Sequence, residues 1–152
     1  MLEWVQTTRL ATTISESLML TAVLSSVHLV GMTLLVGSVL FSSLRLLGLN
    51  FADRTVSEVT AVTGGAIALG LSISVVSGLL LLAPRASASF NNGFFQFKMA
   101  SLLAAVAFHL SLYRRVLRRV NAPRSMLRLT GALALLLWFA VAVAGCAFIL
   151  LE

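Results

Sequence analysis

The chain has 152 residues, of which 59% are hydrophobic and 11% charged, with 11 basic and 5 acidic side chains. A soluble domain normally carries about a quarter charged residues, so this composition excludes a water-facing globular domain and indicates an integral membrane protein. The single cysteine, Cys146, excludes an internal disulfide and a cysteine-based metal cluster. The acidic start, with Glu3 where a signal peptide has basic residues, predicts that the first apolar run stays in the folded protein.

Four apolar stretches approach the length of about 20 helical residues that crosses a hydrocarbon core roughly 30 Å thick. Residues 17–44, 59–84 and 129–151 contain no Asp, Glu, Lys or Arg. The remaining stretch, 99–113, has only 15 uncharged residues. It spans the membrane only if its helix begins near Gly93 and Lys98 extends its ammonium towards the membrane surface.

Capping motifs and helix breakers predict where the first two helices begin and end. Two Ser/Thr-x-x-Glu capping boxes, Thr13–Glu16 and Thr55–Glu58, predict helix starts near residues 14 and 56. Gly48 is expected to end the first helix, and Pro84 the second, because proline removes a backbone donor and clashes with the preceding turn.

The second half of the chain reads as two further helices joined by short connections. Residues 86–93 are predicted to be a polar loop that leads to an Asn cap, and residues 121–123 to be a turn. The predicted helices are about 14–47, 56–83, 94–120 and 125–151. Short loops join antiparallel neighbours, so the predicted fold is all-α, an up-down bundle of four transmembrane helices in one domain, 1–152.

Small residues and tryptophans give expectations about packing. The second helix carries small residues at four-residue spacing, which favours a close approach to another helix: Ala66, Gly70, Ser74 and Gly78. Trp4 is expected at the membrane interface, whereas Trp138 falls too deep in the last helix for that position.

The distribution of basic residues predicts the orientation. Basic side chains in short loops favour the cytoplasmic side. With the N-terminus outside, three basic residues lie outside, Arg9, Arg85 and Lys98, and eight lie inside: Arg45, Arg54, Arg114, Arg115, Arg118, Arg119, Arg124 and Arg128. The chain is therefore predicted to cross the bacterial inner membrane with both termini in the periplasm. The cluster between 114 and 128 is interpreted as an anchor on anionic lipids, and no nucleic-acid partner is expected.

Two histidines, His28 and His109, are the ionisable residues expected deep in the membrane, where such groups are costly and commonly functional. His28 lies 14 residues after Ile14 and His109 lies 14 after Phe95. Both are therefore expected about 21 Å along their helices, although this match fails when it is measured from the inner side. Two imidazoles facing across a bundle are the metal ligands that a six-coordinate b-type haem requires. Gly31, three residues after His28, is expected to give clearance for the macrocycle.

Lys98 has two interpretations. It precedes His109 by 11 residues, which is about 1100° of helix rotation, so the two side chains lie about 20° apart around the helix and about 16 Å apart along it. Lys98 could therefore neutralise a haem propionate. Alternatively, it is an interface lysine whose stem lies along apolar surface.

Other chemistry has weaker support. Met32, four residues after His28, could join three further soft donors in a copper site, namely Met19, Met99 and Cys146, although methionine is also common in apolar cores. The sequence contains no Ser-His-Asp, Cys-His or Walker arrangement, and no carboxylate lies within a span. Hydrolytic or group-transfer activity is therefore not indicated, and whether the chain serves an oxidoreductase stays open.

A family resemblance rests on the first and third helices. The relevant residues are His28-Leu29-Val30-Gly31, Gly37, the run 44–48, Phe94-Phe95-Gln96-Phe97-Lys98-Met99 and His109. This pattern, over about a third of the chain, resembles an uncharacterised group of bacterial four-helix membrane proteins that are similar to copper-resistance-D-like proteins and small membrane cytochromes b. The resemblance implies His28 and His109 as candidate ligands. The larger four-helix cytochromes b carry two histidine pairs, so this chain would hold one haem.

Three functional hypotheses follow. The first is a b-type haem protein for electron transfer, or a membrane subunit of a redox complex, with one bis-histidine haem between the first and third helices. Because one haem does not bridge the membrane, this hypothesis implies a quinone, a redox partner subunit or a second copy of the chain. The second is a copper or small-solute transport protein that uses His28, Met32 and His109. The third is a structural subunit in which both histidines form hydrogen bonds between helices.

Overall fold

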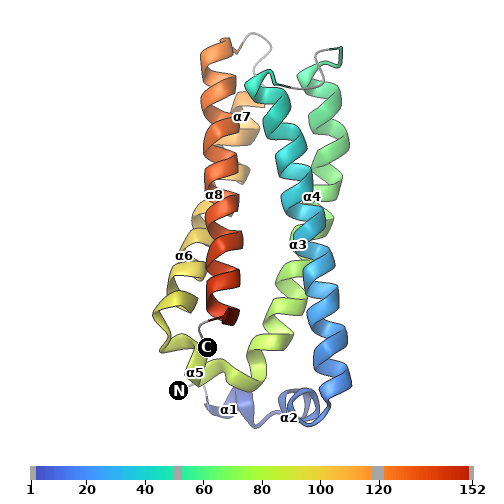
Figure 1. The fold of residues 1–152 in the computed structure, drawn as a ribbon, viewed down its shortest axis with the longest axis vertical. Helices are drawn as coiled ribbons and strands as arrows, with labels where there is room; N and C mark the ends of the chain where they lie inside the picture. Colours follow the sequence, from blue (N-terminus) through green and yellow to red (C-terminus); the bar gives the residue numbers. More distant parts are fainter. Residues whose placement is uncertain (1–2, 50–52, 118–121, 151–152) are drawn as a thin grey trace.

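The computed structural model describes residues 3–49, 53–117 and 122–150. Four helical segments are long and apolar enough to cross a membrane, and together they form the predicted all-α bundle (Figure 1). The segments are α3 (Leu18–Leu47), α4 (Val56–Leu82), α6 (Gly93–Phe108) with its continuation through a π-helical turn (His109–Tyr113) and α7 (Arg114–Leu117), and α8 (Arg124–Leu150). The predicted ends at Val120 and Leu151, together with Arg118 and Arg119, lie outside the described residues.

Four short elements lie across one end of the bundle. They are α1 (Glu3–Gln6), α2 (Arg9–Glu16), a 3₁₀ turn (Ala83–Arg85) and α5 (Ala86–Phe90). This end, at the bottom of Figure 1, is called the N-terminal end; the distal end carries the α3–α4 and α7–α8 connections. α3 and α6 run from the N-terminal end to the distal end, and α4 and α8 run back.

Local capping explains most of the boundaries. The Thr55–Glu58 capping box is confirmed, because the Thr55 side chain accepts from the Glu58 amide and the Glu58 carboxylate accepts from the Thr55 amide. Gly48 ends α3 with a left-handed φ of 77°, a conformation that costs glycine little. Asn92 caps α6 by accepting from the Phe94 amide, as the sequence predicts.

The predicted capping box at Thr13–Glu16 is wrong. Thr13 lies inside α2, where its hydroxyl donates to the Arg9 carbonyl at 2.7 Å, and Glu16 is the last residue of that helix. Thr8 caps α2 instead, and the extended backbone of Ser17 breaks the chain before α3. The first spanning helix therefore begins at Leu18, four residues later than predicted.

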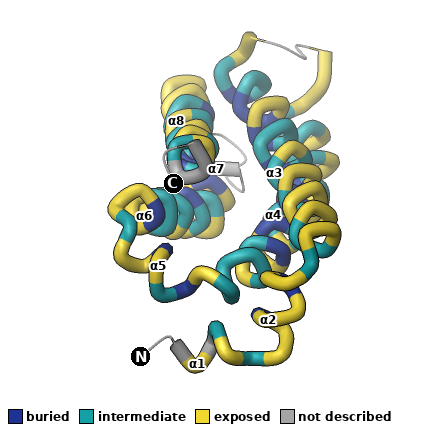
Figure 2. The backbone as a smooth tube through the Cα atoms, turned by 60° about the horizontal axis from the view of Figure 1, so that its bottom comes forward, coloured by how far each residue is buried: buried dark blue, intermediate teal, exposed yellow. Residues whose placement is uncertain are grey.

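Residues 86–90 are also helical, where the sequence predicts a polar loop. Pro84 ends α4 as expected, but the chain continues through the 3₁₀ turn into α5. Gln6 and Ser87 share side-chain hydrogen bonds of 2.9 and 3.2 Å, which join the N-terminal segment to α5. Figure 2 shows α1, α2 and α5 together at the N-terminal end.

Small residues determine the helix contacts. α3 packs along α4, α6 packs along α8, and α3 also contacts α8. A Cβ added to Gly70 would lie 2.7 Å from the Leu35 nitrogen, so α3 and α4 approach backbone to backbone at this glycine. A Cβ on Gly131 would lie 2.9 Å from Leu46 Cβ, which identifies the crossing of α8 and α3 near the distal end. In the described residues, α4 and α6 share no extended contact.

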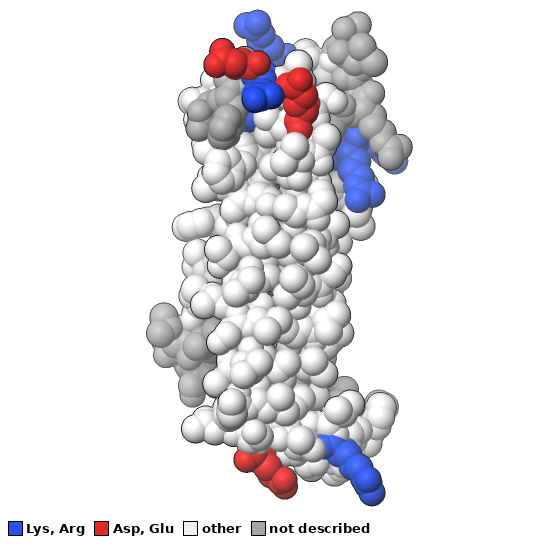
Figure 3. Space-filling model, turned by 90° about the vertical axis from the view of Figure 1, so that its right-hand side faces the viewer, with Lys and Arg blue, Asp and Glu red and all other residues white. Residues whose placement is uncertain are grey.

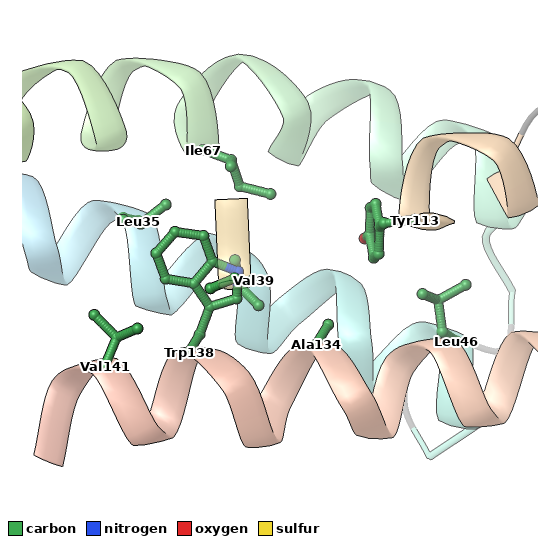
Figure 4. Close-up of a cluster of buried hydrophobic side chains, with 9 residues drawn as sticks. Leu35, Val39, Leu46, Ile67, Tyr113, Ala134, Trp138 and Val141 are labelled. Carbon is green, nitrogen blue, oxygen red and sulfur yellow. The ribbon is translucent and has the colours of Figure 1, made fainter. Parts of the chain in front are cut away.

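Apolar side chains fill the distal half of the bundle between α3, α4, α6 and α8. The nine buried residues of this core are Leu35, Val39, Leu46, Ile67, Ala105, Tyr113, Ala134, Trp138 and Val141 (Figure 4). Trp138 is only 1% exposed and belongs to this core, whereas Trp4 is exposed.

The outer surface is that of a membrane protein. Leucine, valine and phenylalanine side chains are exposed along all four long helices, and they imply contact with lipid. On the face drawn in Figure 3, charged side chains gather at the two ends and leave an uncharged band between them. On this face, ionised groups therefore avoid the depth at which the hydrocarbon core would lie.

Candidate functional site

His28 lies on α3 and faces α4. Its Nδ1 atom is 2.9 Å from Ser77 Oγ, and the Ser77 hydroxyl donates its single proton to the Ile73 carbonyl at 2.6 Å. With the Ser77 proton on the 2.6 Å bond to Ile73, the Ser77 oxygen accepts from His28, and the neutral imidazole then carries its proton on Nδ1. The lone pair is then on Nε2.

Glycines on α4 and α3 shape the surroundings of His28 in different ways. A Cβ on Gly78 would lie 3.1 Å from His28 Cε1, so the imidazole rests against the α4 backbone. Gly31 does not provide the clearance for a macrocycle that the sequence predicts. Its Cβ position is 2.8 Å from both Ile73 Cγ2 and Ser74 Oγ, so α4 already fills that space.

Lys98 lies on α6, in the second turn of that helix. Its stem packs against α8, where a Cβ on Gly145 would be 3.7 Å from Lys98 Cε, and its ammonium lies within electrostatic range of the His28 ring. Lys98 is half-buried. Three long helices therefore bring a histidine, a hydroxyl and an ammonium group together in the half of the bundle nearer the N-terminal end.

His109 lies deeper, at the first residue of the π-helical turn. Its ring stacks on Tyr113 with centroids 4.5 Å apart and an interplanar angle of 19°. The Tyr113 hydroxyl donates to Ser42 Oγ on α3 at 2.8 Å. This hydrogen bond fixes the register of α6 against α3 and places His109 one helical turn from the level of Ser42.

The same register separates the two histidines along the bundle. Tyr113 is bonded to Ser42, so His109, one turn earlier, is level with about residue 38 of α3, ten residues from His28. Ten residues of helix correspond to about 15 Å. Axial ligands of one iron lie on either side of a single atom, so this offset counts against a haem shared by His28 and His109, which stays a prediction. The equal depths expected from the sequence depended on a first helix that began at residue 14.

The donors named for the copper alternative lie in different surroundings. Within residues 3–49, 53–117 and 122–150, no three His, Cys, Asp or Glu side chains come together. Met32 packs against the apolar core, and Met19 is exposed on the outer surface. Cys146 is also exposed, at a depth where it can interact with Lys98.

Sequence reasoning missed Ser77 and Tyr113. Ser77 is adjacent to the small residue Gly78, but nothing in the spacing shows that α4 turns this hydroxyl towards His28. Tyr113 was within reach of a sequence argument, because residues four apart on a helix are neighbours and it follows His109 by four. Its partner Ser42, on another helix, could be found only from the fold.

Comparisons with known proteins place the chain in a family without providing a function. No curated protein and no solved structure matches it. The resemblance to copper-resistance-D-like proteins and small membrane cytochromes b therefore stays a prediction. The model of a family of unknown function, DUF6644, matches residues 1–150, which is nearly the whole chain, and the protein belongs to that family.

Proposed function

We propose that this chain is a membrane-embedded b-type haem protein that takes part in electron transfer, and that His28 rather than the pair His28 and His109 holds the haem. The observation that carries the proposal is the hydrogen bond between His28 Nδ1 and Ser77 Oγ. Histidines that bind metals almost always donate the other ring N–H to a fixed acceptor, which orients the ring and leaves one nitrogen free to ligate. His28 has this arrangement inside a membrane helix.

The number of donors favours haem over a bare metal ion. Copper or zinc needs several protein ligands, and the described residues contain no group of three or more His, Cys, Asp or Glu side chains around His28. A porphyrin brings four nitrogens of its own, so one histidine is enough to hold the iron, as in globins. When bound, haem supplies one-electron redox chemistry.

Lys98 has a defined part in this proposal. A haem carries two propionates, and a lysine in an apolar region favours an anionic partner. Because the Lys98 ammonium lies within electrostatic range of the His28 ring, we propose that it pairs with a carboxylate of a ligand held by His28. In this way the sequence-based interpretation of Lys98 is retained, with His28 in place of His109 as its companion.

The membrane setting and the partners are part of the same proposal. Described basic residues are more numerous at the distal end, where Arg45, Arg54, Arg114, Arg115, Arg124 and Arg128 lie, than at the N-terminal end. The positive-inside rule then favours a cytoplasmic distal end and periplasmic termini in a bacterial inner membrane. A haem near the N-terminal end needs an electron donor and an acceptor, which a quinone, a redox subunit or a second copy would provide.

Absorption spectroscopy tests the proposal directly. The full chain is expressed with sufficient haem and purified without heating, and we expect a Soret band and a haem content approaching one per chain. His28→Ala should lose the haem, whereas the matched variant His109→Ala should keep it. Circular dichroism and gel filtration of both variants show whether each is folded.

The outcomes separate the hypotheses. A colourless wild-type protein under these conditions would exclude the haem function, and bound copper in that sample would support the transport alternative. Loss of haem only in His109→Ala would reject His28 as the ligand. Equal loss in two folded variants would restore the bis-histidine arrangement.

A further inference from the structure

Two ring nitrogens are buried near the middle of the bundle with no hydrogen-bond partner in the described part of the chain. They are Trp138 Nε1 on α8 and His109 Nδ1 at the end of α6. The hydroxyls of Ser43 and Ser74 share this state, but a serine in a helix can turn its hydroxyl towards the carbonyl four residues earlier. A ring nitrogen has no such local acceptor, so these two atoms need a partner from elsewhere.

The two rings lie at the same depth. Gly131 contacts Ser43 and Leu46 of α3, and Trp138 follows seven residues later, about 10 Å towards the N-terminal end. This places Trp138 level with about residue 38 of α3, in agreement with its packing beside Val39 in the core. His109 reaches the same level by an independent route, through the hydrogen bond from Tyr113 to Ser42.

The orientation of the indole agrees with this placement. Figure 4 shows the Trp138 nitrogen on the side of the ring that faces Val39 and, along the bundle, Tyr113. His109 stacks on Tyr113, and the π-helical turn that carries both rings packs against α8. The unpaired N–H of Trp138 therefore points towards the part of the bundle in which the stacked rings of His109 and Tyr113 lie.

We infer that Trp138 and His109 bind one water molecule between them, at the centre of the membrane-spanning bundle. The indole N–H can only donate, and a water oxygen accepts from it while one water proton is donated to His109 Nδ1. Ala105 and Val39 of the same core are 0% and 1% exposed, so the region is closed to solvent and lipid, and a buried water is the usual partner of polar atoms enclosed in this way.

The inference fixes the tautomer of His109. A nitrogen that accepts from water carries no proton, so neutral His109 is protonated at Nε2. His28 is protonated at Nδ1 when the Ser77 proton is on its bond to the Ile73 carbonyl. The two membrane histidines therefore hold opposite tautomers, and His109 is a water-binding residue in the wild-type protein whether or not His28 holds a haem.

Nuclear magnetic resonance of the ¹⁵N-labelled full chain in lipid nanodiscs tests this site, and the haem-free protein is sufficient. We expect a magnetisation-transfer peak between water and the Trp138 indole proton, a hydrogen-bonded indole shift, and imidazole ¹⁵N shifts of the Nε2–H tautomer for His109. Trp4 is exposed and serves as the internal reference for an indole in contact with bulk solvent or lipid headgroups.

Two variants separate the inference from simpler explanations. Tyr113→Phe keeps the stacked ring and should keep the water peak at Trp138, whereas His109→Leu should lose it. A hydrogen-bonded indole without a water peak in the wild type would indicate a direct bond from Trp138 to His109 and overturn the inference. So would an unbonded indole, or a wild-type His109 protonated at Nδ1, and both are measured without any variant.

Discussion

Gly70→Ala is expected to destabilise the bundle, because Gly70 lies where two helix backbones meet. An added Cβ would be 2.7 Å from the Leu35 nitrogen and 2.8 Å from the Gly31 carbonyl oxygen, and ordinary contact begins only at 3.4 Å. Both atoms belong to the α3 backbone, so no side chain can rotate away. The helices must separate by several tenths of an ångström along their shared interface.

The size of the effect follows from two opposing contributions. Overpacking a tight interior typically costs about 1–3 kcal/mol, and a clash with backbone belongs at the upper end of this range. Replacing glycine by alanine in a helix contributes up to about 1 kcal/mol of stability. Gly64→Ala, on the same helix, has only this favourable contribution, because nothing lies within 4 Å of its Cβ position. The two variants should therefore differ by about 3 kcal/mol, roughly a hundredfold in the folded-to-unfolded ratio.

Titration of the purified protein from mild detergent into dodecyl sulfate measures this difference. Far-ultraviolet circular dichroism and the fluorescence of the buried Trp138 report unfolding. We expect Gly70→Ala to unfold at a lower denaturant fraction than the wild type, and Gly64→Ala at the same fraction or a higher one. Equal midpoints for the two variants would refute the close approach of α3 and α4 at Gly70.

Three further predictions concern the candidate site and the orientation. In a haem titration, Ser77→Ala should weaken haem binding by about 10- to 100-fold, because it removes the acceptor that orients His28. The control Ser72→Ala should bind haem like the wild type, because the Ser72 hydroxyl donates only to a carbonyl of its own helix. Lys98→Met should lower the haem midpoint potential by an amount on the order of tens of millivolts, because a nearby positive charge favours the reduced state, whereas Lys98→Arg should leave the potential unchanged. Equal potentials for Lys98→Met and the wild type in a redox titration would assign Lys98 to the membrane interface. A reporter fused after the last residue should be active in the periplasm and one placed in the α7–α8 connection in the cytoplasm; the reverse pattern would invert the orientation.

The sequence was sufficient for the spans and for local capping. Apolar length predicts three of the four spans, and the third span in the chain also needs a helix start near Gly93. The bonds of the Thr55–Glu58 box depend on residues three apart, which the chain brings together by itself. The same pattern at Thr13–Glu16 failed because neighbouring residues decide whether Thr13 is a cap or an interior residue. Thr8 begins α2 earlier, and Thr13 is then already in a helix.

The candidate site could be predicted only in part, because its geometry depends on register between helices. His28, Lys98 and His109 are visible as polar residues in apolar runs. Which of them share a depth is determined by contacts far apart in sequence, chiefly that of Tyr113 with Ser42. Because the chain breaks at Ser17, the first spanning helix begins at Leu18 and not at residue 14. The depth of His28 is therefore counted from a later residue, and this changes which residue is expected to be its partner.

The pairing of the long helices bears on how the chain assembles. α3 with α4 and α6 with α8 form two hairpins of consecutive spanning segments, and in the described residues the hairpins meet mainly through α3 and α8. Each hairpin can insert and pack as its own segments leave the translocation machinery, and their union is a separate, later event. Two fragments divided between α4 and α6 and produced together in one cell should therefore associate into a complete bundle.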